Sequence, residues 1–558
     1  MIRAEIEETD VRVTGRGLAL LRLKADVIAE LGSLVKSNDN GFTFPLAALW
    51  RVLTILQRAN LGEPWIAATI EGDGTHATAR EKAIEIIATD TIPVFDNRWD
   101  NILDPPQAKA VGAMIVPGLR GLCLFDEQGS GKTVMAIAAF DLLRERQDVD
   151  AMIVACPKSM MSEWPRDLGR FAPDYEVVVA RGTSAVKYQT ALSHFDVLVT
   201  NYEGLGAIFP AIKTFADRRK YLLVVDESFL VKNEDALRSR IVRELRNHCV
   251  RCFVLCGTPA PNSAHDLVNQ FNLADKGFTF GSFRMSKDPQ TDWLPISNLM
   301  EDRGLYIRRM KAEILGKVPN KNFHVIRVDL RGTQARMYEQ AREELELSLR
   351  TLTNDLFRRS LTTYFQRRSA LLQICAVPTM IDPTFAEVPV KYEVLDRLVE
   401  DLVSQNRKVI IWSFYTRSIQ EIVQRYARLR PVQIHGQIST QERGEAVLSF
   451  QTDPEVMVFV GNPAAAGAGI TLTASYDAIY LSFSNQAAHY LQSLDRVHRR
   501  GQASDEVNYY LLVCRNTIEE TEVIRLRGKE LNQHSLLSDP VKWPTSLDDA
   551  LRELSPHV

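Results

Sequence analysis

The feature that most limits the fold of this chain is a set of short, β-branched apolar runs that alternate with helical stretches. One series begins at residue 121 and contains "GLCLF", "DAMIVAC", "YEVVVA", "FDVLVTN", "YLLVVDE" and "RCFVLCG". A second begins at residue 408 and contains "KVIIWS", "PVQIHG", "VMVFVGN", "AIYLS" and "VNYYLLV". Runs that are apolar throughout are typical of strands buried on both faces of a sheet. Two such series predict an α/β protein with two parallel, doubly wound sheets.

The segments outside these series predict smaller units. Residues 334–376 carry no strand signal and indicate a helical insertion, while the N-terminal segment shows the order helix, turn, short strand, helix. We therefore expect five parts: an N-terminal α+β accessory domain that binds DNA or docks a partner, a first lobe, a linker with a helical protrusion, a second lobe and a short tail. Their expected bounds are 1–95, 96–300, 301–385, 386–535 and 536–558.

Composition and charge narrow the class of protein. Lys and Arg number 67 against 70 Asp and Glu, a net charge of −3, so a uniformly basic coat for nucleic acid is excluded and any polyanion site must be local. The seven cysteines form no paired framework, which fits a reducing compartment. The N-terminus lacks a signal peptide, and no apolar stretch reaches the roughly 20 residues of a membrane span. These features predict a soluble intracellular protein without a membrane partner.

A phosphate-binding loop is predicted at "FDEQGSGKT", which follows the run "GLCLF" and opens a helical stretch. Gly129 and Gly131, on either side of Ser130, allow backbone N–H groups to turn toward phosphates at a helix N-terminus. Lys132 would reach the β- and γ-phosphates, and the Thr133 hydroxyl would hold Mg²⁺. Asp126 occupies the place of the first glycine that such loops usually have.

Two carboxylates follow at the expected distance from this loop. The buried run "YLLVVDE" ends in Asp226 and Glu227. Asp226 would bind Mg²⁺ through water, and Glu227 would orient the water that attacks the γ-phosphate. Together with the loop, the pair predicts ATP hydrolysis.

Further motifs occur in a fixed order along the chain: "LDPPQ", "DEQGSGKT", "VACPKSMMSEWPRDL", "VTNYEGL", "LCGTPAPN", "KVIIWSFYTRSIQEI", "GAGITLTASYDAIYLSFS" and "LQSLDRVHRRGQ". In this order they resemble the Swi/Snf family of superfamily 2 ATPases, over about residues 100 to 530. The resemblance implies two RecA-like lobes, ATP with Mg²⁺, and movement along double-stranded DNA. It also implies that Gln107 reads the adenine base.

The concentration of arginine in "DRVHRRGQ" acquires a role from this resemblance. Gln492, Arg496 and Arg499 are at helical spacing, so they are expected on one helix face. The resemblance implies that this face is turned toward ATP, with Arg496 and Arg499 as arginine fingers and Gln492 beside them. Such a finger contributes about 10³ to 10⁵ in rate in nucleotide hydrolases. His498 and Arg500 are interpreted as packing or solvent-facing residues.

The same family resemblance implies contacts to the DNA backbone, which would make binding independent of sequence and strongly dependent on salt. The implied residues are Lys158, Asn201 and Tyr202 on the first lobe, with Ser413, Thr471 and Thr473 on the second. The sequence departs from the family pattern at Phe229, which stands where a histidine is usual after the two carboxylates and which puts coupling to the next motif in doubt.

Three functional hypotheses follow. The first is a double-stranded DNA translocase in DNA repair, fork remodelling or antiviral defence, with a nuclease or other protein as a partner, cytoplasmic in a bacterium or phage host and nuclear in a eukaryote. The second is a strand-separating helicase acting on DNA or RNA. The third is an ATP-regulated DNA-binding scaffold without motor activity, which the complete set of catalytic residues disfavours.

Overall fold

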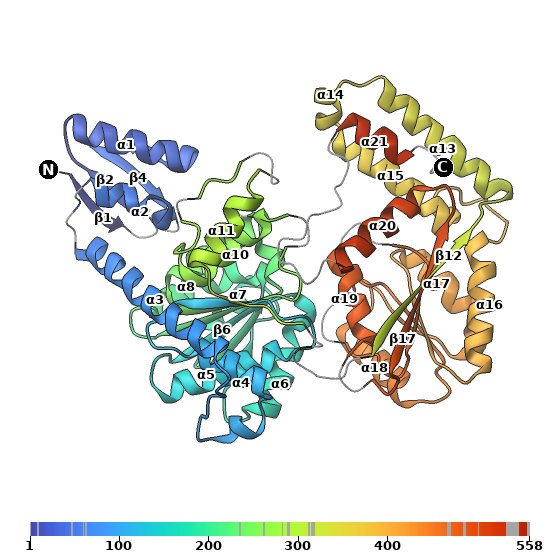
Figure 1. The fold of residues 1–558 in the computed structure, drawn as a ribbon, viewed down its shortest axis with the longest axis horizontal. Helices are drawn as coiled ribbons and strands as arrows, with labels where there is room; N and C mark the ends of the chain where they lie inside the picture. The colour runs from blue at the N-terminus through green and yellow to red at the C-terminus, as the bar shows by residue number, and fades with distance from the viewer. Residues whose placement is uncertain are drawn as a thin grey trace. The chain divides into compact units, whose positions relative to one another are not determined.

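The computed structural model describes most of the chain, in two compact units, Met1–Ile314 and Leu315–Val558 (Figure 1). The residues outside the description are 1, 8–9, 39, 46–47, 60, 62–63, 234–235, 261–262, 282, 287–290, 311–312, 314–318, 466–469, 484–486, 500–501, 532–545 and 555–558. Arg500, interpreted above as a bystander, is among them.

The N-terminal segment contains a sheet larger than the single strand that the sequence indicates. Its four antiparallel strands lie in the order β1-β2-β4-β3, and α1 and α2 follow β2 and β4 in the chain. The bounds are β1 Arg3–Glu7, β2 Asp10–Thr14, α1 Leu18–Leu31, β3 Lys36–Asn38, β4 Gly41–Pro45 and α2 Leu49–Arg58. Val11, Val13, Phe42 and Phe44 of the sheet pack with apolar residues of both helices. The first two strands, five residues each, alternate charged and apolar positions, which is the pattern of a half-buried strand and a signal that the prediction did not use.

The first unit also contains a seven-stranded sheet of parallel pairs, in the order β11-β5-β10-β9-β6-β8-β7. The strands are β5 Gly121–Leu124, β6 Ala151–Cys156, β7 Val177–Val179, β8 Val197–Asn201, β9 Tyr221–Asp226, β10 Cys249–Leu255 and β11 Tyr306–Ile307. The first six are the predicted strands. β11, only two residues long, is too short to give a sequence signal.

Helices cover both faces of this sheet. Alternate strand residues such as Leu122, Val154 and Val224 pack with α4, α5 and α6, while α10 packs against β5 and β10. The helices are α3 Pro64–Ala88, α4 Pro105–Met114, α5 Lys132–Glu145, α6 Glu163–Phe171, α7 Ser184–Leu192, α8 Leu205–Phe215, α9 Leu237–Asn247, α10 His265–Asp275 and α11 Trp293–Arg303.

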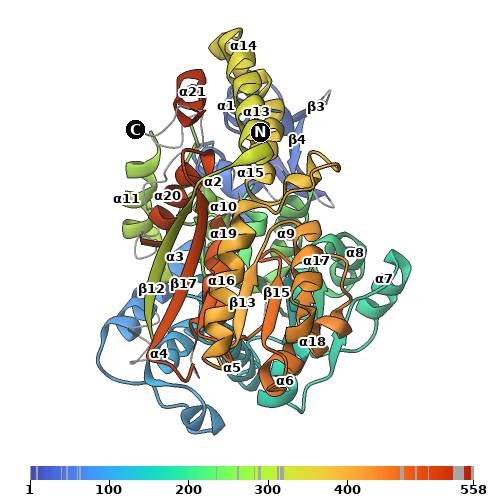
Figure 2. The ribbon, with the colours of Figure 1, turned by 90° about the vertical axis from the view of Figure 1, so that its right-hand side faces the viewer.

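The second unit contains a six-stranded parallel sheet in the order β12-β17-β16-β13-β15-β14. The strands are β12 Asn320–Val328, β13 Val409–Trp412, β14 Val432–Ile434, β15 Val458–Gly461, β16 Asp477–Tyr480 and β17 Glu506–Cys514. β12 lies beside β17 over nine residue pairs (Figure 2), although it falls in the segment predicted as linker and helical protrusion. Its mixed polar sequence fits an edge strand with one partner rather than a buried central strand.

One face of the second sheet packs with α19 and α20, and the other with α16 and α17. The helices of this unit are α13 Gly332–Arg350, α14 Asn354–Arg359, α15 Leu361–Ala376, α16 Val390–Ser404, α17 Thr416–Arg425, α18 Thr440–Thr452, α19 Ala487–Val497, α20 Ile518–Leu531 and α21 Leu547–Leu554. The two parallel sheets with helices on both faces confirm the predicted fold class.

The C-terminal segment, expected to be a short tail, includes a docked helix. α21 packs into the core of the helical insertion formed by α13 and α15. Arg368 of α15 pairs with Glu553 of α21 and with Glu522 of α20, and all three side chains are at most 5 % exposed. Composition alone does not predict this docking, because the helix faces that meet carry charged side chains among their apolar residues. No helix in the described part of the chain combines the length and hydropathy of a membrane span.

A buried histidine in α3 predicts acid sensitivity of the first unit. His76 is 1 % exposed, and its Nδ1 accepts the Arg120 backbone N–H at 3.2 Å. Burial, with nearby arginines, lowers its pKa from 6.5 to about 3. The unfolded chain therefore takes up a proton at this residue as the pH falls below 6.5, and the folded protein does not. Stability is expected to fall with decreasing pH in this window, by about 1.4 kcal/mol per pH unit from this group.

The measurement is thermal unfolding of the wild type and His76→Gln at pH 6.5 and pH 5. Gln can still accept the Arg120 N–H but does not titrate. The variant should lose less stability than the wild type over this interval. Equal losses would assign the acid sensitivity to other groups.

Candidate nucleotide site

The loop between β5 and α5 has the backbone of a phosphate cradle. Gly129 and Gly131 have φ values of 84° and 87°, in the left-handed region that glycine adopts without strain. A Cβ at Gly131 would lie 2.4 Å from Nε2 of Gln107. The glycine is therefore needed both for the turn and for close packing, and α5 begins at the next residue, Lys132.

Lys132 and its neighbours fit a bound polyphosphate. The Lys132 ammonium donates to the carbonyl oxygens of Asp126 and Glu127, at 2.8 and 3.2 Å, and so spans the loop. The Ser130 hydroxyl is buried and has no hydrogen-bond partner within the described residues. An anion at the N-terminus of α5 would meet a lysine, backbone N–H groups and a favourable helix dipole. Thr133 lies in the first turn of α5 and is half-buried.

Asp226 ends β9, two strands from the loop strand β5 in the same sheet. Its carboxylate accepts the indole N–H of Trp164 at 2.9 Å and the Glu227 backbone N–H at 2.9 Å. Burial raises the pKa of Asp226, against the opposing effects of Trp164 and Lys132. A divalent cation would favour the ionised form. The carboxylate of Asp226 and the hydroxyl of Thr133 are oxygen ligands of the kind that Mg²⁺ prefers.

Glu227 occupies a sharp turn directly after the strand. Its φ and ψ are both 52°, a left-handed conformation that costs a residue with a side chain about 1–2 kcal/mol. Glu227 Oε1 accepts a hydrogen bond from Nε2 of Gln128, in the phosphate loop, at 3.1 Å. The absence of a side chain at Gly257 leaves room for Gln128, because a Cβ there would lie 2.4 Å from Gln128 Cγ. The turn therefore aims the carboxylate toward the loop.

Gln107 links helix α4 to the phosphate loop. Its Oε1 accepts the Asp104 backbone N–H at 3.0 Å, as part of a capping box, and its Nε2 donates to the Ser130 carbonyl at 2.9 Å. The amide retains one N–H and one lone pair for a further ligand. Its implied contact with adenine stays a prediction.

Asp126, in the place of the missing glycine, is fully buried and pairs with Arg309. The Asp126 carboxylate also accepts the Arg309 backbone N–H at 2.9 Å, and Arg309 donates to the Pro106 carbonyl oxygen. Arg309 thereby ties the start of α4 to the phosphate loop.

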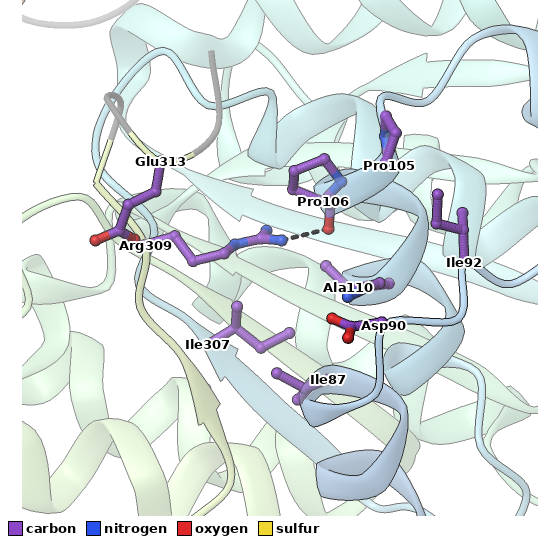
Figure 3. Close-up of a pocket in the computed structure, with 10 residues that line it drawn as sticks. Ile87, Asp90, Ile92, Pro105, Pro106, Ala110, Ile307, Arg309 and Glu313 are labelled. Atoms are coloured by element: carbon purple, nitrogen blue, oxygen red, sulfur yellow. Dashed lines mark hydrogen bonds between the residues drawn. The ribbon is translucent and has the colours of Figure 1, made fainter. Parts of the chain in front are cut away.

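Figure 3 shows this guanidinium in the wall of a cavity of about 300 Å³ beside α4. The cavity is lined by Ile87, Asp90, Ile92, Pro105, Pro106, Lys109, Ala110, Ile307, Arg309 and Glu313. None of the predicted site residues lines it. The helix positions 105, 106, 109 and 110 also lie on a different face of α4 from Gln107.

The predicted arginines lie in the second unit and meet at one backbone carbonyl. Arg496 donates to the Ile470 carbonyl oxygen at 3.4 Å and Arg499 donates to it at 3.1 Å. Arg499 also donates to the Thr471 hydroxyl at 2.8 Å. The expectation of one continuous helix face is wrong for Arg499, because α19 ends at Val497. Gln492 is on the helix and buried.

His498, interpreted as a packing residue, is 5 % exposed, and its Nε2 is 2.8 Å from the Pro319 carbonyl oxygen. This contact ties the turn after α19 to the residue that precedes β12. It supports the packing interpretation.

The six predicted DNA-contact residues differ in accessibility. Lys158 is exposed, and Asn201, Thr471 and Thr473 are half-buried. Tyr202 is 2 % exposed and its hydroxyl donates to the Asp226 carbonyl, while Ser413 is fully buried 3.2 Å from the Ser482 hydroxyl. The side chains of Tyr202 and Ser413 are therefore held inside their own units and are not available for a direct contact with DNA.

Sequence reasoning missed several residues that shape the site: Gln128, Trp164, Ser228, Gln270 and Arg309. Gln128 and Ser228 are adjacent in sequence to predicted site residues, and this adjacency could have indicated that they belong to the site. The other three lie far along the chain from the residues that they contact, and no pattern in one sequence places them there.

Known protein families match two parts of this chain. Residues 107–380 match the SNF2-related domain and residues 390–501 the helicase conserved C-terminal domain. The chain is 27 % identical to the human (Homo sapiens) DNA annealing helicase and endonuclease ZRANB3, over 77 % of this chain and 41 % of that protein. It is 28 % identical to the putative ATP-dependent helicase/translocase YwqA of Bacillus subtilis (strain 168), over 76 % of this chain and 47 % of that protein.

A third relative is the CHD3-type chromatin-remodeling factor CHR7 of Arabidopsis thaliana, 28 % identical over 77 % of this chain and 37 % of that protein. The chain thus spans less than half the length of each of these relatives. The solved SWI2/SNF2 ATPase core of Sulfolobus solfataricus in complex with dsDNA is 22 % identical, with a TM-score of 0.36 over 82 % of this chain and 97 % of that one, a score too low to bear on fold or substrate.

Proposed function

This chain belongs to the Swi/Snf family of superfamily 2 ATPases, and from that premise we propose that it hydrolyses ATP to move along double-stranded DNA. The observation that carries the proposal is the convergence of the phosphate loop with Asp226 and Glu227 at one edge of the first sheet. Gln128 bridges the two by its hydrogen bond to Glu227. A loop for phosphates and a carboxylate for water are the two parts that hydrolysis of a nucleotide needs.

In the proposed reaction each residue has one task. Gly129, Ser130 and Gly131 present the loop to the phosphates, Lys132 neutralises them, and Gln107 reads the base. Thr133 and Asp226 would hold Mg²⁺, which neutralises the phosphate charge when bound. Glu227 orients the attacking water and accepts its proton.

We propose that the second unit supplies the residues that stabilise the transition state. Arg496 and Arg499 would stabilise the charge that develops on the γ-phosphate in the hydrolysing state, with Gln492 beside them. Their shared hydrogen bond to the Ile470 carbonyl supports a common role, because it brings both guanidinium groups to one point despite the end of the helix between them.

Duplex DNA is the proposed track. In support, the relatives carry names such as DNA annealing helicase and helicase/translocase. Lys158, Asn201 and Thr473 offer accessible polar groups for phosphates, while Tyr202 and Ser413 would act through the backbone that they hold. Contact with phosphates alone gives binding that is independent of sequence and that weakens as salt rises. DNA repair, fork remodelling or defence, with a partner protein such as a nuclease, is the proposed setting.

The test is steady-state ATP hydrolysis at fixed low salt, without polynucleotide and with duplex DNA, single-stranded DNA or duplex RNA. We expect strong stimulation by duplex DNA alone, lost as salt is raised. Preferential stimulation by single strands or RNA would replace the translocase with a strand-separating helicase. No hydrolysis with any polynucleotide, in a protein that binds DNA, would favour the scaffold hypothesis.

A further inference from the structure

Two turns of the first unit must keep their relative position if Glu227 is to aim at the loop. The carboxylate turn, residues 226–229, follows β9, and the Gly257 turn, residues 256–259, follows the neighbouring strand β10. From the contacts between them we infer that Gln270 of α10 is a positioning residue that holds the carboxylate turn to the Gly257 turn through Ser228. This role deepens the proposed function and rests on it.

Gln270 is fully buried and makes three side-chain hydrogen bonds. Its Nε2 donates to the carbonyl oxygens of Pro259 and Asp266, at 2.6 and 2.5 Å. Its Oε1 accepts the Ser228 hydroxyl at 2.5 Å. Only an amide NH₂ can face two carbonyl oxygens, so the orientation of the side chain is fixed and the Ser228 hydroxyl must be the donor. One side chain thus bonds to both turns at once.

Ser228 is well placed to fix the direction of Glu227. It directly follows the left-handed Glu227 backbone, and its own side chain is fully buried. A strained conformation persists only where the surroundings determine it on both sides. Before the strained residue, Asp226 Oδ1 accepts the Glu227 N–H. After it, the Ser228 hydroxyl is anchored on Gln270. Loss of the second anchor would let the turn relax and the carboxylate swing.

Other residues of α10 hold the segment that follows the carboxylate turn. Asn269 donates to the Val231 carbonyl oxygen, and Asp266 pairs with Lys232 at 2.9 Å. Positions 266, 269 and 270 are at helical spacing and form one face of α10. This face of α10 therefore contacts residues 228, 231 and 232 together, and its Gln270 also contacts the Gly257 turn.

Phe229 explains why a serine would carry this link. Its side chain has no polar atom, so it cannot make a side-chain hydrogen bond to the Gly257 turn. Two hydrogen bonds through α10 join the carboxylate turn to the Gly257 turn. The Ser228 hydroxyl donates to Gln270, and Gln270 donates to the Pro259 carbonyl oxygen. The coupling that the departure at Phe229 put in doubt has a physical route one residue earlier.

The test compares Ser228→Ala, Gln270→Met and the double variant with the wild type, by ATP kinetics with saturating duplex DNA. Each single change is expected to lower kcat about tenfold, because a small misplacement of a catalytic group is costly, while KM for ATP changes less than about twofold. The double variant should be no slower than Gln270→Met, since both changes cut one connection. Ser228→Cys, similar in size but a weaker donor, should fall between wild type and Ser228→Ala.

The matched control is Thr279→Val. Thr279 is 1 % exposed and donates to Asp275, the last residue of α10, at 2.5 Å. It should lose thermal stability as the test variants do and keep the wild-type kcat. A folded Ser228→Ala protein with the wild-type kcat would overturn the inference. This variant decides the test even if Gln270→Met does not fold. A wild type that does not hydrolyse ATP with any polynucleotide would instead overturn the proposed function.

Discussion

Glu227→Gln is expected to lower kcat for ATP hydrolysis by about 10² to 10⁴, the range that a positioned general base contributes. The amide keeps a carbonyl oxygen that can accept the hydrogen bond from Gln128, so the turn and the loop should stay in place. What it loses is the negative charge and the basic oxygen that take the proton of the attacking water. Binding of ATP and of duplex DNA should therefore be unchanged.

The measurement is single-turnover hydrolysis, with equilibrium binding of ATP and DNA by the same preparation. Glu176→Gln is the matched control, because Glu176 is on the same unit, is 57 % exposed and pairs only with His194 among its described partners. It should match the wild type. If Glu227→Gln hydrolysed ATP at the wild-type rate, the role of general base would pass to another group, and the proposed mechanism would be wrong at its central step.

The strands were the most predictable part of this fold. β5, β6, β8, β9, β13, β15 and β16 are buried almost throughout, so most of their positions are apolar and the pattern is continuous. β12 and the first three strands of the N-terminal sheet were missed, whereas β4 is the short strand expected there. β3 and β12 are edge strands of largely polar or mixed sequence, and the alternation of charged and apolar residues in β1 and β2 is a signal that the prediction did not use. The docking of α21 depends on the pair Arg368–Glu553, whose partners are 185 residues apart.

The candidate site divides in the same way. Asp226 and Glu227 were predictable because they lie at the end of a strand, and Lys132 because it opens the helix after the loop that follows a strand. Local sequence thus fixes the place of all three at the carboxyl ends of the strands. Gln270 and Arg309 reach the site from separate elements, and only the folded chain brings them there. The helical spacing of Arg496 and Arg499 was a sound pattern that the end of α19 interrupts. Periodicity shows which face a residue would occupy and not where the helix stops.

Arg499→Ala is expected to lower kcat by about 10³ or more, with KM for ATP changed far less. The reason is that a guanidinium acting on developing charge stabilises the transition state more than bound ATP. The change also removes hydrogen bonds to the Ile470 carbonyl and the Thr471 hydroxyl, so a loss of stability must be separated from a loss of catalysis. Thermal unfolding of the variant provides that separation.

Two further variants make the result specific. Arg499→Lys keeps the charge but not the planar fork of donors, so kcat should recover only in part. Arg428→Ala removes a positive charge from the same unit at a side chain that is 73 % exposed and pairs with Glu400. Exposed pairs of this kind contribute about 0–1 kcal/mol, and kcat should not change. An Arg499→Ala protein that is folded and keeps the wild-type kcat would mean that Arg499 only braces the Ile470 backbone, and that Arg496 is the remaining candidate for the transition-state contact.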